Sequence, residues 1–161
     1  MNHKAFIDGT LTSATFYQTV IDCMMNAFAL HKIILDDDGN PCDYEFVNVN
    51  PAFELMTGLK KEAIINSKIT EVIPKIREDK VDWIEIYGNV ALKGESIVFD
   101  SYSEALEKWY SVNAYCPNEG FFITVFTDIS QLKKNEEDLR EKNTALTPHK
   151  SDCSTWSIMR V

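Results

Sequence analysis

Four cysteines and three histidines are the residues of this sequence best suited to bind a metal or act as nucleophiles. The cysteines are Cys23, Cys42, Cys116 and Cys153, and no two of them have the C-x-x-C spacing of zinc and iron–sulfur sites. No closely spaced pair of histidines completes such a set. We therefore expect no metal site and reduced thiols throughout.

The acidic run at 36–38, followed by Gly39, is the strongest candidate for a calcium loop. An EF-hand loop beginning at this run would need glycine at its sixth position and glutamate at its twelfth, where this chain has Pro41 and Val47. The run is instead rich in residues that favour turns. It predicts a tight connection between two strands.

Motifs of the common enzyme classes are missing from the sequence. There is no glycine-rich phosphate loop, no H-E-x-x-H, no G-x-S-x-G, and no serine or cysteine with an evident histidine partner. We expect no catalytic residue and no enzymatic activity. The carboxylates are expected at the solvated surface.

The chain has 161 residues, a formal charge of −9 and a pI near 4.8. This charge disfavours binding to nucleic acid or to anionic membrane surfaces. The apolar stretch at 20–30 is interrupted by Asp22 and Asn26, and it is too short to span a bilayer. With no secretory signal either, we expect a cytoplasmic protein without membrane insertion.

The first half of the chain predicts a helix and a β-hairpin. Apolar residues at three- and four-residue spacing predict an amphipathic helix over 13–25, which would either cover the domain or form a dimer. Strands at 27–35 and 43–49 flank the acidic turn.

Helices and three further strands follow the hairpin. We predict a short helix at 51–57, an irregular region through 61–74, and a longer, largely buried helix at 79–92. Aromatic and β-branched residues then predict strands at 96–103, 108–116 and 120–128. This order indicates an α+β fold with a five-stranded antiparallel sheet.

A polar helix is predicted at the C-terminal end of the sheet. Leu132, Leu139 and Leu146 recur every seven residues in it, but polar residues at the alternate positions weaken the case for a coiled coil. The expected organisation is a flanking helix at 1–26, one domain at 27–129, a helix at 130–146 and a disordered tail at 147–161.

Four local patterns occur in an order and spacing that is specific to one family. They are Asn48-Val49-Asn50-Pro51-Ala52-Phe53 after the hairpin, Thr57-Gly58 at a helix end, Lys108-Trp109-Tyr110 opening a strand, and Asp128-Ile129-Ser130 ending the sheet. With these patterns, residues from about 24 to 143 resemble the PAS sensor domain of bacterial signalling proteins, including its PAC portion. The resemblance implies a five-stranded antiparallel sheet with helices on one face.

The resemblance also implies a role in signal transduction. Such domains are usually input modules of histidine kinases or diguanylate cyclases, and they often dimerise through flanking helices. Asp128, Ile129 and Ser130 match the Asp-Ile-Thr junction that couples the sheet to the outgoing helix, with serine in place of threonine. No kinase or cyclase motif occurs in 147–161, so the chain is either a stand-alone sensor or a piece of a longer protein.

Two cofactors known in this family are not expected here. Flavin-binding relatives carry a reactive cysteine in an Asn-Cys-Arg motif, whereas the corresponding stretch at 50–53 has none. Haem-binding relatives commonly use a histidine of the long helix, and 79–93 contains none. His31 lies on the first predicted strand. A lone histidine on a strand is more often a structural or surface residue than a haem ligand.

A small-molecule pocket between the helices and the sheet remains a hypothesis. Five residues would supply its polar and aromatic groups: Trp83, Tyr87, Tyr102, Asn113 and Thr124. The alternative is that the aromatic rings pack a filled core and the polar side chains face water. Strand alternation alone leaves open whether Asn113 or Val112 points inward.

We therefore predict a non-enzymatic sensory domain that homodimerises, binds a small ligand or a partner, and acts on a downstream effector through its C-terminal helix. The alternative is a protein-interaction module of the same fold without a ligand. A small enzyme would need a carboxylate with a raised pKa inside the pocket, and no pattern places one there.

Overall fold

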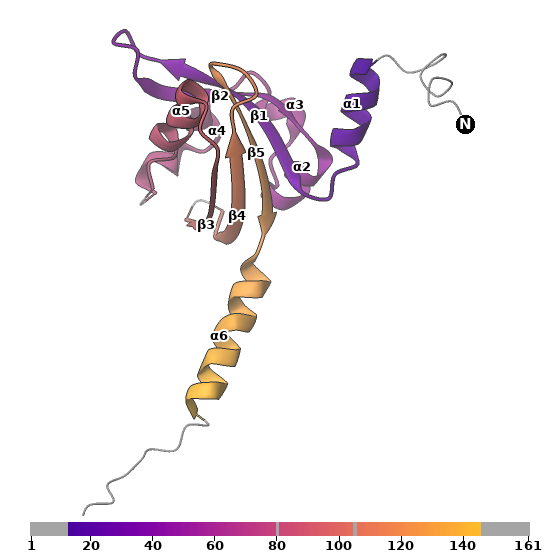
Figure 1. Cartoon of the computed structure of the whole chain (residues 1–161), viewed down its shortest axis with the longest axis vertical. Coiled ribbons are helices and arrows are strands. Elements are labelled where there is room, and N and C mark those ends of the chain that lie inside the picture. The colour runs from indigo at the N-terminus through magenta and orange to yellow at the C-terminus, as the bar shows by residue number, and fades with distance from the viewer. Residues whose placement is uncertain (1–12, 80, 105, 146–161) are drawn as a thin grey trace, which may run out of the picture. The chain divides into compact units, whose positions relative to one another are not determined.

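Five strands form one antiparallel sheet in the order β2-β1-β5-β4-β3 (Figure 1). They are β1 (Ala27–Leu35), β2 (Pro41–Val49), β3 (Ile97–Ser103), β4 (Lys108–Tyr115) and β5 (Phe121–Asp128). The computed structural model describes residues 13–79, 81–104 and 106–145. The predicted α+β fold with a five-stranded antiparallel sheet is confirmed.

Six α-helices and one 3-10 helix accompany the sheet in the described part of the chain. They are α1 (Ser13–Asp22), α2 (Pro51–Thr57), α3 (Lys61–Ile64), α4 (Ile69–Val72), η2 (Pro74–Glu78), α5 (Trp83–Lys93) and α6 (Ser130–Ala145). The apolar residues of α2 to α5 join those of one sheet face in a single core. Phe122 and Val90 are almost completely buried there.

Two predicted helix boundaries are wrong. The helix predicted at 79–92 begins only at Trp83, because the Asp82 side chain accepts a hydrogen bond from the Glu85 N–H and so caps the helix there. The 3-10 helix η2, which begins at Pro74, already ends at Glu78. The helix predicted at 13–25 ends at Asp22.

The short helix α2 shows how local sequence sets its bounds. Asn50 caps its first turn by accepting a hydrogen bond from the Phe53 N–H, and Pro51 occupies the first helical position. Gly58 ends it in the left-handed region at φ 76°. Both boundaries confirm the prediction.

The described residues up to Ser130 form one compact unit, and those from Gln131 onward form a second. In the second unit, Leu132 and Leu139 of α6 are exposed. The heptad position Leu146, the predicted tail at 147–161 and the start of the flanking segment at 1–12 lie outside the described residues. Among the helices that the structure describes, none is long and apolar enough to cross a membrane.

Candidate functional site

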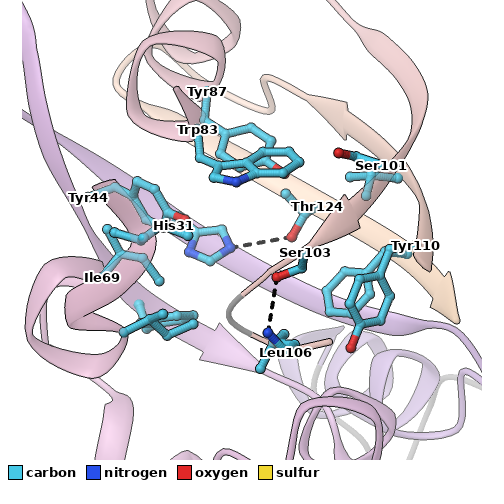
Figure 2. Close-up of a pocket in the computed structure, with 15 residues that line it drawn as sticks. His31, Tyr44, Ile69, Trp83, Tyr87, Ser101, Ser103, Leu106, Tyr110 and Thr124 are labelled. Atoms are coloured by element: carbon cyan, nitrogen blue, oxygen red, sulfur yellow. Dashed lines mark hydrogen bonds between the residues drawn. The ribbon is translucent and has the colours of Figure 1, made fainter. Parts of the chain in front are cut away.

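A cavity of about 110 Å³ lies between the helices and the inner face of the sheet (Figure 2). All five strands contribute to its wall, together with α4, η2 and α5. Aromatic side chains make up much of the lining: Tyr44, Phe46, Trp83, Tyr87, Tyr110 and Phe126. Thr124, Ser101 and Ser103 add hydroxyl groups.

His31 of β1 is the most unusual group in this wall. It is 4% exposed, and its Nε2 lies 3.3 Å from the Thr124 Oγ1 on β5. Its Nδ1 is buried and has no hydrogen-bond partner among the described residues. Burial lowers the pKa of the imidazole to about 3, so His31 is neutral at physiological pH.

A row of stacked aromatic rings connects β1 to α5 at this wall. The His31 ring stacks on Phe122 with centroids 4.6 Å apart, and Phe122 stacks on Tyr87 at 4.9 Å. Tyr87 in turn stacks on Trp83 at 5.8 Å, one turn away on α5. Parallel packing of this kind couples the first strand to the long helix through the core.

The tyrosine hydroxyls of the cavity are also neutral. Burial raises the pKa of Tyr44 and of Tyr87 well above the ordinary tyrosine value, and it raises the pKa of Tyr110 to about 12. None of the residues that line the cavity is an aspartate, glutamate, lysine or arginine. The cavity thus offers neutral hydrogen-bonding groups in an aromatic wall.

The structure brings together three of the five residues that the sequence singled out for a pocket. Trp83, Tyr87 and Thr124 line the cavity (Figure 2). Tyr102 and Asn113 do not: both are exposed.

Strand alternation explains the placement of these two residues. Val112 and Ala114 are buried on either side of Asn113, so the Asn113 side chain points to the opposite face of the sheet. Tyr102 lies on that outer face too, with its ring 5.7 Å from the ring of Trp109.

Sequence reasoning missed five polar residues of the cavity, which are His31, Tyr44, Ser101, Ser103 and Tyr110. His31 has the same strand parity as Ala27, Ala29 and Ile33, which are all buried. Phe28, Leu30 and Ile34 are apolar at the opposite parity, so the sequence of this strand gave little sign that His31 points inward.

The junction predicted to transmit a signal forms a hydrogen-bonded corner at the end of β5. The Ser130 N–H donates to the Asp128 Oδ1 at 2.9 Å, and the Trp109 N–H donates to the Ser130 Oγ at 3.0 Å. The Lys108 Nζ lies 3.1 Å from the Asp128 Oδ2. Partial burial acts to raise the pKa of Asp128, but the Ser130 hydrogen bonds and Lys108 outweigh it and lower the pKa.

One backbone carbonyl links this corner to the cavity. The Met56 carbonyl at the end of α2 accepts a hydrogen bond from the Lys108 Nζ at 3.2 Å. It accepts a second one from the Tyr110 hydroxyl at 3.4 Å. Because Tyr110 lines the cavity and Lys108 pairs with Asp128, the two sites share a partner.

In the part of the chain that the structure describes, no three His, Cys, Asp or Glu side chains are grouped so as to hold a metal ion.

Comparison with known proteins identifies the fold. Residues 15–91 match the family model of the PAS domain. The structure is similar to that of an RNA-binding light-oxygen-voltage receptor, with 14% identity, a TM-score of 0.56, and coverage of 86% of this chain and 39% of that one. At this identity the similarity supports the fold alone, and the chain spans well under half of that receptor's length.

A weaker similarity joins the chain to a domain of a sensory box sensor histidine kinase/response regulator from Geobacter sulfurreducens. The identity is 12%, the TM-score is 0.48, and the match covers 76% of this chain and 99% of that one. No curated protein matches the sequence. The family match over 15–91, the five-stranded sheet and the helices packed on its inner face agree, and this chain therefore contains a PAS domain.

Proposed function

We propose that this chain is a sensory domain that binds a small molecule in the cavity and passes the change to an effector through the corner at Asp128, Ile129 and Ser130. The supporting observation is the cavity itself, with an aromatic wall and a few hydroxyl groups. In this proposal 27–129 is the sensor and 130–146 is the output helix.

The unfilled space between the aromatic walls favours a ligand over a permanently filled core. A concave, mostly apolar site with a few polar groups is the usual form of a small-molecule site.

Transmission would run through the shared Met56 carbonyl. A ligand that displaces the Tyr110 ring changes the Tyr110 hydrogen bond to this carbonyl, and with it the position of Lys108. Lys108 is paired with Asp128, so the cap on Ser130 responds. The ligand must bind two arrangements of this corner unequally for a signal to result.

The output side of the proposal rests on the family resemblance. We infer a homodimer formed through the flanking helices, with an effector of the histidine kinase or diguanylate cyclase type downstream. The exposed Leu132 and Leu139 of α6 supply the apolar positions that such pairing needs. The domain itself is proposed to be non-catalytic.

The ligand-binding step is tested with a variant that fills the cavity. Val112 is 6% exposed and lines it, so Val112→Phe places extra carbon atoms in the space. The matched control is Val98→Phe on the neighbouring strand, where Val98 is 71% exposed. Native mass spectrometry of freshly purified full chain should show an adduct in the wild type and the control, and none in Val112→Phe. The same adduct on folded Val112→Phe would contradict a ligand in this cavity.

The transmission step is tested separately, in a fusion of the chain to a reporter kinase. Asp128→Ala removes the acceptor of the Ser130 N–H and the partner of Lys108, and it should uncouple kinase output from the signal. An unchanged response in a folded Asp128→Ala fusion would remove the junction from the mechanism.

A partner-binding module without a ligand is the second candidate, and one observation favours it. The outer face of the sheet exposes Val98, Tyr102, Trp109 and Tyr115 by 37% to 71%. Aromatic side chains of this kind are enriched at protein interfaces. If Val112→Phe signals normally and Tyr115→Ser does not, this candidate replaces the first.

A further inference from the structure

Two hydroxyl groups in the wall of the cavity are each held by a hydrogen bond within the protein. The Leu106 N–H donates to the Ser103 Oγ at 3.3 Å, and the His31 Nε2 lies 3.3 Å from the Thr124 Oγ1. Figure 2 shows both contacts as dashed lines that end at the two hydroxyl oxygens. Ser103 lies on β3 and Thr124 on β5, and both residues belong to the lining.

The imidazole of His31 sets the direction of its bond to Thr124. The His31 Nδ1 is buried without a partner among the described residues, so a proton on it would be an unpaired donor. In the protein main chain, buried N–H groups without an acceptor are rarer than carbonyls with an unused lone pair. The same preference places the single proton of the neutral ring on Nε2. The Nε2–H therefore donates, and the Thr124 Oγ1 accepts.

Both hydroxyls keep their own proton for another acceptor. A serine or threonine hydroxyl has one proton and two lone pairs, and one lone pair takes the bond from Leu106 or from His31. Among the described residues, no protein acceptor takes the hydroxyl proton of Ser103 or of Thr124. The two side chains are thus left as hydrogen-bond donors on the cavity wall.

The rest of the lining limits which molecule can carry the acceptor. Aromatic and aliphatic side chains make up most of the lining, so the body of a fitting ligand is apolar. No lysine or arginine lines the cavity, and a carboxylate would lose its hydration there without a counter-charge. A neutral carbonyl oxygen has lone pairs and no proton, so it complements a pair of donors.

We propose that the cavity recognises a carbonyl compound with an apolar body, and that Ser103 and Thr124 donate hydrogen bonds to its carbonyl group. This inference rests on the proposed ligand-binding function and adds to it the chemical class of the ligand and the two residues that select it. His31 and Leu106 act as positioning residues, because each holds one of the two hydroxyl oxygens.

Two pairs of probes test the inference on the full chain. Acetophenone and α-methylstyrene have nearly the same shape and differ in a carbonyl oxygen against a CH₂ group. Cyclohexanone and methylenecyclohexane repeat the comparison with a body that is not aromatic. Binding is followed by NMR through the Trp83 indole N–H and the Ser101 amide, which belong to cavity residues. Because each pair shares its apolar body, the ratio of ketone affinity to alkene affinity reports the hydrogen bonds.

Variants then assign this ratio to the two hydroxyls. Ser103→Ala and Thr124→Val each remove one donor, and each should lower the ratio about fivefold, the effect of one neutral hydrogen bond. Thr124→Ser keeps the hydroxyl and should keep the ratio. Ser111→Ala is the matched control and should leave the ratio unchanged. Ser111 lies between the buried Tyr110 and Val112, so its hydroxyl is on the outer face of the sheet.

The outcomes separate this inference from the proposed function. An unchanged ratio in folded Ser103→Ala or in folded Thr124→Val would overturn the inference. If Thr124→Val does not fold, Ser103→Ala decides, because Ser103 is only partly buried. If no probe shifts either signal, the inference also fails, but a native adduct that Val112→Phe lacks would leave the ligand-binding cavity in place. An adduct retained by folded Val112→Phe would remove the proposed function and this inference with it.

Discussion

Gly88 lies where α5 approaches the start of β2 most closely, and Gly88→Ala tests that approach. A Cβ atom built on Gly88 would lie 2.2 Å from the Cγ and 2.4 Å from the Cβ of Pro41. Ordinary carbon contacts are about 3.5–4.0 Å, so the new methyl group is more than about 1 Å too close. The Pro41 ring is rigid, and therefore the helix or the strand has to move.

The expected change in stability combines two opposing effects. Overpacking a core contact costs typically about 1–3 kcal/mol, and a contact this short against a rigid ring belongs at the upper end. Alanine is favoured over glycine inside a helix by about 1 kcal/mol, which offsets part of that cost. We expect Gly88→Ala to lower the free energy of unfolding by about 2 kcal/mol.

Urea unfolding followed by far-UV circular dichroism measures this change. With a slope of about 2 kcal/mol per molar urea, the midpoint should fall by about 1 M. The control is the same substitution in a Pro41→Gly background, which removes the two atoms that are too close to the methyl group and leaves the ordinary contact with the Ile33 Cδ1 at 3.7 Å. There Gly88→Ala should stabilise by about 1 kcal/mol, since only the helix preference remains. A Gly88→Ala variant as stable as the wild type in the original background would refute the close approach.

Three further predictions concern buried or paired polar groups. Asn50→Ala should destabilise the domain by about 3 kcal/mol, because Asn50 is 1% exposed and its four hydrogen bonds join α2 to the start of β1, to the loop before it and to the end of α1. Relative to His31→Gln, the wild type should lose about 2 kcal/mol of stability between pH 7 and pH 5. The unfolded His31 takes up a proton below its ordinary pKa of 6.5, whereas the folded residue does so only near 3. Asp128→Asn should cost about 1 kcal/mol at pH 7, because it loses the charged partner of Lys108.

Each of these three has its own measurement and control. Thermal and urea unfolding of Asn50→Ala should be compared with Asn50→Asp, which keeps the two accepted hydrogen bonds and should be less damaging. A parallel pH dependence of the wild type and His31→Gln from pH 7 to 5 would contradict a buried neutral histidine. The lowered pKa of Asp128 stabilises the fold above the ordinary value of 3.8. The gap between wild type and Asp128→Asn should therefore close as the pH falls below that value, and a constant gap would argue against the ion pair.

The order and type of the elements could be predicted from local patterns in the sequence. Period-two alternation, turn residues and caps act within a few residues of one another, so the five strands and the α2 boundaries follow from neighbouring side chains. The helix predicted from 79 is the exception. Its apolar stripe begins at Val81, but the Asp82 cap makes Trp83 the first helical residue.

The sequence also determined which enzyme and metal-binding motifs the chain lacks. It indicated in addition which residue types a pocket would use. Trp83, Tyr87 and Thr124 were named from residue type alone, and the structure places all three in one wall. Tyr102 and Asn113 were named by the same reasoning, but they lie on the other face. Side chains alternate between the two faces of a strand, so a shift of one residue along the strand moves a side chain from the cavity to the outer face.

Only the tertiary structure decided that a cavity exists and which groups meet in it. His31 and Thr124 are 93 residues apart in sequence, and they meet because β1 and β5 are neighbours in the sheet. Tyr110 and Lys108 likewise meet the Met56 carbonyl across more than 50 residues. The size of the cavity depends on how the side chains of all five strands pack against those of the covering helices. Local sequence patterns carry no information on how such distant surfaces fit.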